Sequence, residues 1–175
     1  MKSVGDDVIR LLLENGADPN EFERDDAPIL WWAVVNDCES VVQLLVEAVA
    51  EIDLVIKACD FALNLPLFTA IGWEHVAIAK YLIDHGADVN VVDKSGHGEM
   101  YCVTPIVVRA TQSENEALVR ALLQSPDIKL NGTDLSQIPL IYAAKQGNLG
   151  IVRLLVENGV RINYGTVARR RMLCL

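Results

Sequence analysis

Apolar and polar positions follow one another in a pattern that returns at near-regular intervals along the chain. The stretches LLLENGADPN at 11–20, YLIDHGADVN at 81–90 and LLVENGVRIN at 154–163 each carry an apolar run into a polar turn. The turns after these runs and two similar ones are marked by Gly16, Val49, Gly86, Pro126 and Gly159, spaced 33, 37, 40 and 33 residues apart. A period near 33 with two insertions indicates an array of repeated structural units.

Each unit carries the pattern of two helices. The first reads PILWWAV from 28, PLFTAI from 66, TPIVVRA from 104 and IPLIYAA from 138, and proline suits the first turn of a helix. A second helix follows a short polar break; in the last unit Ile151, Leu154 and Leu155 share one face. Gly86 and Gly159 are expected to close their helices, because glycine accepts a positive φ. Two short helices cannot bury their apolar faces alone, so we expect the units to stack.

These residues resemble the ankyrin repeat, whose consensus runs G-x-TPLHxAAxxGHxxVVxLLLxxGADVN. Segments 65–90 and 138–163 align with it without a gap. Segments 27–53 and 104–131 align with one extra residue relative to the consensus. The resemblance implies an all-α fold, an ankyrin-repeat solenoid of stacked helix-turn-helix units with β-hairpin loops. It divides an array at 1–163 into one partial and four full repeats, at 5–20, 21–53, 54–90, 91–131 and 132–163. Residues 164–175 would be a basic C-terminal tail or a truncated next repeat.

The two ends depart from the consensus. The first unit matches only the second helix and the turn, so Val8, Leu11 and Leu12 are expected to have an uncovered apolar side. Terminal repeats normally carry polar outer faces, and neither end has the residues of such a cap. The alternative that the chain is a fragment of a longer array therefore stays open.

The resemblance also implies a function, because ankyrin arrays bind other proteins through a concave face and hairpin tips, without catalysis. Carried over along the motif, the partner-binding residues at the ends of the first helices are Gly72 and Trp73, Thr111 and Gln112, and Lys145 and Gln146, with Asn64 beside a hairpin arm. Trp73 is a large aromatic residue on a polar edge, which is typical of a binding anchor. Local packing is the alternative for Trp73.

A long inserted loop and a tryptophan pair add further candidates. Residues 93–105 exceed the consensus length, and Glu99, Met100 and Tyr101 in this loop would reach a partner; a tolerated surface insertion is the alternative. Trp31 and Trp32 are adjacent, so on a helix they point about 100° apart. At least one of the two is expected in the core.

Charge and composition narrow the function further. The net charge is −9, and an acidic surface repels phosphate backbones, so nucleic-acid binding is disfavoured. No apolar run approaches the roughly 20 residues of a membrane span. Four cysteines without CxxC spacing and an N-terminus without an apolar signal region favour an intracellular, cytoplasmic protein; the nucleus is the alternative compartment.

No chemistry-bearing motif accompanies the repeats. His97 and Cys102, with His85 as a third candidate, lack the spacing of a zinc site, and there is no GxSxG, HExxH or P-loop. We expect a monomer with no cofactor that binds a protein partner of unknown identity. The alternatives are a small regulatory inhibitor of a kinase or transcription factor, a structural segment of a longer scaffold, and an accessory domain of an enzyme.

Overall fold

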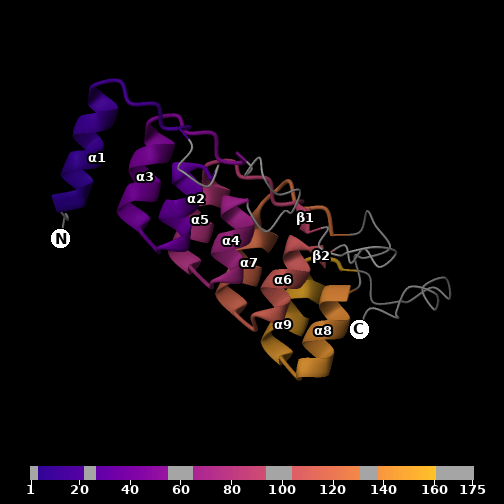
Figure 1. Ribbon diagram of the computed structural model, residues 1–175. Coiled ribbons are helices and arrows are strands. Elements are labelled where there is room, and N and C mark those ends of the chain that lie inside the picture. The colour runs from indigo at the N-terminus through magenta and orange to yellow at the C-terminus, as the bar shows by residue number, and fades with distance from the viewer. Residues whose placement is uncertain (1–3, 22–26, 55–64, 94–103, 131–137, 161–175) are drawn as a thin grey trace, which may run out of the picture. The chain divides into compact units, whose positions relative to one another are not determined.

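The computed structural model describes residues 4–21, 27–54, 65–93, 104–130 and 138–160. The chain divides into two compact units, unit 1 at residues 1–88 and unit 2 at residues 89–175. In both units the secondary structure is dominated by short helices joined in pairs by tight turns (Figure 1). The all-α repeat fold expected from the sequence is therefore confirmed.

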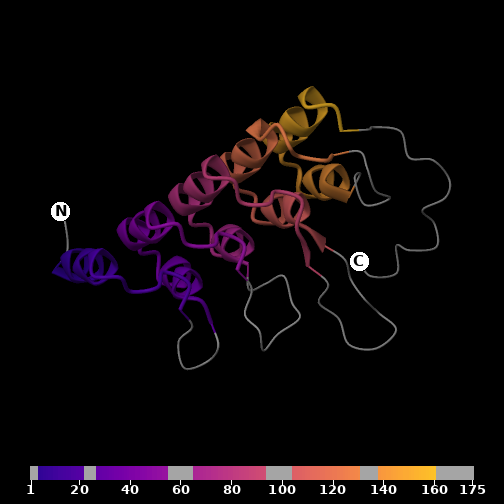
Figure 2. The same ribbon diagram turned by 90° about the horizontal axis from the view of Figure 1, so that it is seen from above.

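The described residues of unit 1 form a single helix followed by two helix pairs. Its helices are α1 (Val4–Glu14), α2 (Ile29–Val35), α3 (Glu39–Glu47), α4 (Pro66–Gly72) and α5 (Val76–Asp84). Within pairs, α2 packs against α3 and α4 against α5; between pairs, α2 contacts α4, α3 contacts α5, and α1 contacts α3. Seen from above, α1, α3 and α5 form one row and α2 and α4 another (Figure 2). Helix α1 thus occupies the place of a second helix.

In unit 2, the described residues form two helix pairs and a short β ladder. Its elements are β1 (Val92–Asp93), β2 (Thr104–Pro105), α6 (Ile106–Gln112), α7 (Glu116–Gln124), α8 (Ile138–Gln146) and α9 (Leu149–Glu157). The strands pair antiparallel, with Val92 opposite Pro105. Helix α6 packs against α7 and α8, and α9 against α7 and α8. The ladder is the base of the expected hairpin that carries the inserted loop.

The core repeats from pair to pair, because the same helix positions face inward each time. A leucine four residues before the turn marker is buried in every full repeat, as Leu45, Leu82, Leu122 and Leu155. Burying a leucine side chain contributes about 1.5–3 kcal/mol. The equivalent residue of α1, Leu12, is 55% exposed, and Val8 and Leu11 are exposed as well. The uncovered apolar side expected for α1 is confirmed.

Four of the five described turns after a second helix use a left-handed residue. Gly86 and Gly159 have φ of +93° and +80°, as the sequence predicted, and Gly16 has +88°. Val49 takes the same position with φ of +66° although it has a β-branched side chain. The turn after α7 differs, because its C-cap residue, Ser125, is extended with ψ of 129°, and Pro126 follows it.

The prolines lie at the start of the first helices, two of them inside the first turn and two just before it. Pro66 is the first residue of α4 and Pro139 the second residue of α8, which confirms the prediction for these two helices. Pro28 and Pro105 lie one residue before α2 and α6, as the N-caps. Proline is tolerated at both places, since the N–H it lacks would have no partner inside the helix. The shift by one residue matters for the register of the candidate site.

Candidate functional site

The candidate site lies at the turns between the first and second helices of each pair. One residue in every such turn has a positive φ: Asp37 at +54°, Glu74 at +62°, Glu114 at +58° and Gly147 at +72°. Each donates its backbone N–H to the carbonyl oxygen three residues earlier, at 3.1–3.2 Å. These four turns share one conformation, so they define which residues are equivalent from repeat to repeat.

This register corrects one of the predicted site residues. Counted from the left-handed residue, Gly72 and Trp73 are equivalent to Gln112 and Ser113, not to Thr111 and Gln112 as the consensus alignment placed them. Thr111 is equivalent to Ile71; it is fully buried, and its hydroxyl donates to the Val107 carbonyl at 2.8 Å. The reason is the extra residue between Pro105 and the buried Ala110, which moves everything after it by one position. Thr111 is therefore an interior residue.

Trp73 is the most prominent side chain of these turns. It is the C-cap residue of α4, and 64% of it is exposed. Its backbone is held firmly: Trp73 N–H donates to Thr69 O at 3.0 Å, and His75 N–H donates to Ala70 O at 2.8 Å. Gly72, just before it, is half-buried. A large aromatic side chain is thus presented to solvent from a fixed backbone.

The surroundings of Trp73 in unit 1 are acidic. The neighbouring turn comes within contact distance, because His75 Nδ1 lies 3.2 Å from Asp37 Oδ1. Glu74 and Asp37 are both exposed. His75 is largely buried, and its Nε2 has no hydrogen-bond partner among the described residues. Two exposed carboxylates thus lie near this part of the backbone: Glu74 follows Trp73 directly, and Asp37 contacts His75 two residues further on.

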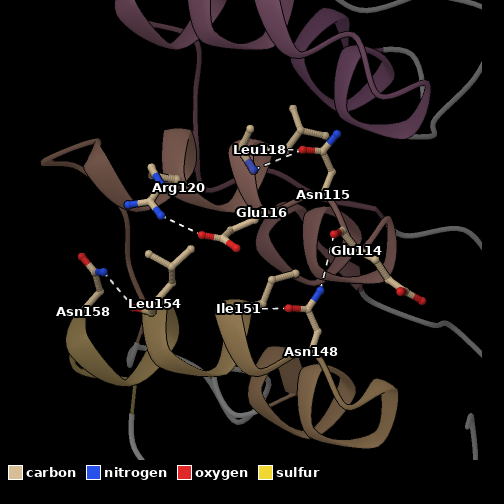
Figure 3. Close-up of polar contacts among 10 residues, drawn as sticks. Glu114, Asn115, Glu116, Leu118, Arg120, Asn148, Ile151, Leu154 and Asn158 are labelled. Carbon is tan, nitrogen blue, oxygen red and sulfur yellow. Dashed lines mark hydrogen bonds and ion pairs between the residues drawn. The ribbon is translucent and has the colours of Figure 1, made fainter.

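The equivalent turns of unit 2 are polar. Gln146 Nε2 donates to the Gln112 carbonyl at 3.4 Å, so these two predicted residues are neighbours. Lys145 and Gln146 are exposed, and Gln112 is half-buried. Asn148 Nδ2 donates to the Glu114 carbonyl at 3.5 Å, and its Oδ1 accepts from Ile151 N–H at 3.1 Å, so it caps α9 and joins the two turns (Figure 3). The structure brings this part of the predicted set together.

The tryptophan pair belongs to the packing of unit 1. Trp31 Nε1 donates to Thr69 Oγ1 at 3.0 Å, which links α2 to α4. The rings of Trp31 and Trp32 meet edge to face with centroids 5.3 Å apart, and both residues are half-buried. The remaining predicted residues, Asn64, Glu99, Met100 and Tyr101, lie outside the described residues.

A second set of polar contacts, which the sequence analysis did not identify, links successive repeats on the loop side. Asn20 Oδ1 accepts from Glu51 N–H at 2.6 Å, and Asn90 Oδ1 accepts from Lys129 N–H at 2.8 Å. Asp53 takes the equivalent role and accepts from Asp88 N–H at 3.2 Å. The three side chains belong to the last residue of each GADxN-like turn, which is the signal that could have revealed these contacts. We call this set of contacts the inter-repeat ladder.

Asp53 stabilises the inter-repeat ladder less than Asn20 and Asn90 do, because its side chain carries a charge. Loss of solvent around its carboxylate and the negative charge of Asp88 raise its pKa above 3.8, although the hydrogen bond from Asp88 N–H opposes this. A raised pKa means that the folded state disfavours the charged form. The contribution of Asp53 to the free energy of unfolding is therefore most favourable below pH 3.8, and this favourable contribution is lost as the pH rises through the folded-state pKa.

We expect Asp53→Asn to stabilise unit 1 at pH 7. The amide oxygen still accepts from Asp88 N–H, and the repulsion between the two carboxylates disappears. The gain should be about 1–2 °C in Tm, since an exposed substitution changes stability by roughly 0.5 kcal/mol. Thermal unfolding between pH 7 and pH 3.5 should show the difference from wild type shrinking as the pH falls. A difference that stays constant with pH would contradict this role.

Other features of the described residues add no recognisable chemistry. An open depression of about 530 Å³ between α1 and α3 is lined partly by Asp6, Asp37 and Glu39, and Ser40 Oγ donates to Asp6 Oδ1 at 2.9 Å. Within the part of the chain that the structure covers, no three His, Cys, Asp or Glu side chains gather as metal ligands. None of the described helices is both long and apolar enough to cross a membrane.

The stacked pairs with left-handed turns define a helical repeat protein. A family model described as ankyrin repeats, in three copies, matches residues 2–93 and 94–166. The chain belongs to the ankyrin repeat family, whose repeats are protein–protein interaction modules and are in general non-enzymatic.

Relatives with very different names share these repeats. Alpha-latrocrustotoxin-Lt1a of Latrodectus tredecimguttatus is 34% identical over 83 residues, 47% of this chain and 6% of the toxin. Ankyrin repeat and KH domain-containing protein mask-1 of Caenorhabditis elegans is 26% identical over 181 residues, 90% of this chain and 7% of that protein. Alpha-latroinsectotoxin-Lt1a of the same Latrodectus species is 25% identical over 164 residues, 86% and 11% respectively. The chain thus spans about a tenth or less of each of these relatives.

Proposed function

We propose that the chain binds a protein partner through the turns of unit 1, with Trp73 as the anchor. The observation that carries this is the 64% exposure of Trp73 on a backbone fixed by hydrogen bonds. Exposing so large an apolar side chain forgoes the stability that its burial would give. Tryptophan is enriched among the residues that dominate binding energy, because it buries a large area with little loss of side-chain freedom.

The charge around Trp73 suggests the chemistry of the partner. Asp37 and Glu74 are exposed, Glu74 next to the anchor in the chain and Asp37 against His75, and no lysine or arginine is paired with them among the described residues. A partner that offers an apolar pocket bordered by lysine or arginine would complement this surface. Such charges would mainly raise the association rate and set the orientation, while the buried indole would supply affinity.

The turn residues of unit 2 are a separate and weaker candidate surface. Lys145 and Gln146 are exposed, and Gln112 lies beside Gln146. Polar rim residues of this kind usually change the affinity little when they are truncated. We therefore assign the larger part of the binding energy to unit 1.

Trp73→Ala is expected to weaken partner binding at least about 30-fold, which corresponds to about 2 kcal/mol at a central anchor. Its melting temperature should stay close to that of wild type, because the side chain is exposed. The measurement is quantitative affinity capture with wild type and variant from the same lysate, followed by titration of the protein that the wild type enriches.

The matched control is Val49→Gly. Val49 is 82% exposed in the same unit but on the turn after α3, so this substitution also removes an exposed apolar side chain. It should leave capture unchanged. Equal capture by wild type and Trp73→Ala would overturn the assignment of the site. Equal loss in both variants would show that general exposed apolar surface, and not a specific site, is responsible.

A further inference from the structure

Helix α1 presents an exposed apolar face, whereas the equivalent leucines of the other second helices of unit 1 are buried. The carbonyl oxygens of Leu12, Leu45 and Leu82 each accept from the N–H five residues later at 3.0 Å, so these leucines are equivalent. Leu45 and Leu82 are at most 2% exposed, whereas Leu12 is 55% exposed and Leu11 60%. Exposed apolar surface of this extent on one helix face is a mark of an interaction site.

The outer side of α9 is uncovered in a complementary way. Val119 in α7 is fully buried, and the same second-helix position in α9 holds Val152, which is only half-buried. Val156 is 39% exposed, whereas its equivalent, Leu123, is buried. The side of α9 that corresponds to the covered side of α7 is therefore open within the described residues.

Charge distinguishes the two ends. Residues 1–88 contain 5 Lys and Arg against 17 Asp and Glu, a net charge of −12, and residues 89–175 contain 10 against 7, a net charge of +3. Two α1 faces brought together would oppose the acidic units of two copies. An α1 face brought to the α9 side of another copy would join an acidic unit to a basic one.

Packing between α7 and α9 supplies a template for that contact. Leu154 and Ile151 point from α9 toward α7 (Figure 3), and Gly150 lies so close to the Glu116 carboxylate that a Cβ there would collide with it. In the repeat register, Gly150 and Leu154 correspond to Asp7 and Leu11 of α1. Helix α1 can thus present a leucine at the spacing that α9 uses.

The same template provides an ion pair. Arg120 in α7 bonds to Glu116 one turn earlier on its own helix, at 2.7 Å (Figure 3). The equivalent residue in α9 is Arg153, but Leu149 stands where Glu116 would be. An incoming α1 would bring Asp7 to the place of Gly150, within reach of Arg153. The acid that α9 lacks would come from the second copy.

We propose that the 175-residue chain associates head to tail, with α1 of one copy seated on the outer side of α9 of the next. The contact joins Leu11 to Val152 and Val156, and Asp7 to Arg153. It is heterologous, so it leaves one free α1 and one free α9 in every dimer and allows longer chains. The proposal differs from the monomer that the sequence analysis expected.

Two one-sided variants test the arrangement by sedimentation velocity. Leu11→Glu blocks the α1 face and Val156→Glu blocks the α9 side. Both residues are exposed, so at high dilution, where copies do not associate, both variants should keep the wild-type melting curve. Wild type should grow beyond dimers as concentration rises. Each variant alone should be monomeric, and an equal mixture should stop at dimers, because one open face of each kind remains.

A charge swap adds a second readout. Asp7→Arg and Arg153→Asp should each weaken association at least about 3-fold, and the double variant should regain most of it; added salt should weaken the wild-type contact. Wild type that stays monomeric at all concentrations would overturn the proposal. Dimers formed by Val156→Glu alone would overturn it too, since they would require contact between two α1 faces.

Discussion

Leu82→Ala is expected to destabilise unit 1 by about 2–5 kcal/mol, whereas Leu12→Ala should cost less than about 1 kcal/mol. The two leucines occupy the same position of the repeat, and the same atoms are removed. Leu82 is completely buried, while Leu12 is 55% exposed. Removing Leu82 therefore loses apolar burial and leaves a cavity, and removing Leu12 loses little of either.

Urea unfolding followed by circular dichroism measures both losses. The comparison should be made at high dilution, where association between copies does not contribute. Because alanine favours helices at least as well as leucine, helix propensity cannot explain a difference between the variants. Equal losses at the two positions would contradict the placement of α1 at an uncovered edge of unit 1.

Exchanging glycine and valine at two equivalent turns should change stability in opposite directions. Val49 and Gly86 both have a positive φ, +66° and +93°. A left-handed conformation costs an ordinary residue about 1–2 kcal/mol, and glycine gives back about 0.5–1 kcal/mol through its greater freedom in the unfolded chain. Val49→Gly should therefore stabilise by up to about 1 kcal/mol. By the same balance, Gly86→Val should destabilise by up to about 1 kcal/mol.

Steric contacts are not part of this expectation. A Cβ added at Gly86 would meet no atom within 4 Å, and Val49 is 82% exposed, so both effects come from the backbone. Thermal unfolding of the two variants and the double variant gives the two changes and their sum. Destabilisation by Val49→Gly would show that the valine side chain makes a contact that its exposure does not reveal.

Most of the fold could be predicted from the sequence because it depends on local, repeated signals. The turns at Gly16, Gly86 and Gly159 have the left-handed backbone that favours glycine, and the buried leucines follow from their spacing to these turns. Val49 has the same backbone as the glycines, which its side chain gives no reason to expect. That turn could be placed only from the period of its neighbours.

The candidate site was less predictable, because it depends on register and exposure. The segment from Pro105 to Ala110 has one residue more than the consensus, and the sequence does not show where this extra residue lies. Thr111 was therefore assigned to the surface although it is buried. The exposure of Trp73 could not follow from its type, since a tryptophan at a helix end can as easily pack on the next turn. Only the arrangement of neighbouring turns decides this.

The fluorescence of Trp73 tests the central claim most directly. The chain contains three tryptophans, so Trp31→Phe with Trp32→Phe leaves Trp73 as the sole emitter, once melting shows that this variant is folded. Its emission should be typical of a solvent-exposed indole and readily quenched by acrylamide. Saturating amounts of the captured partner should shift the emission to the blue and protect it from quenching. Unchanged emission and quenching in the saturated complex would show that the partner binds elsewhere.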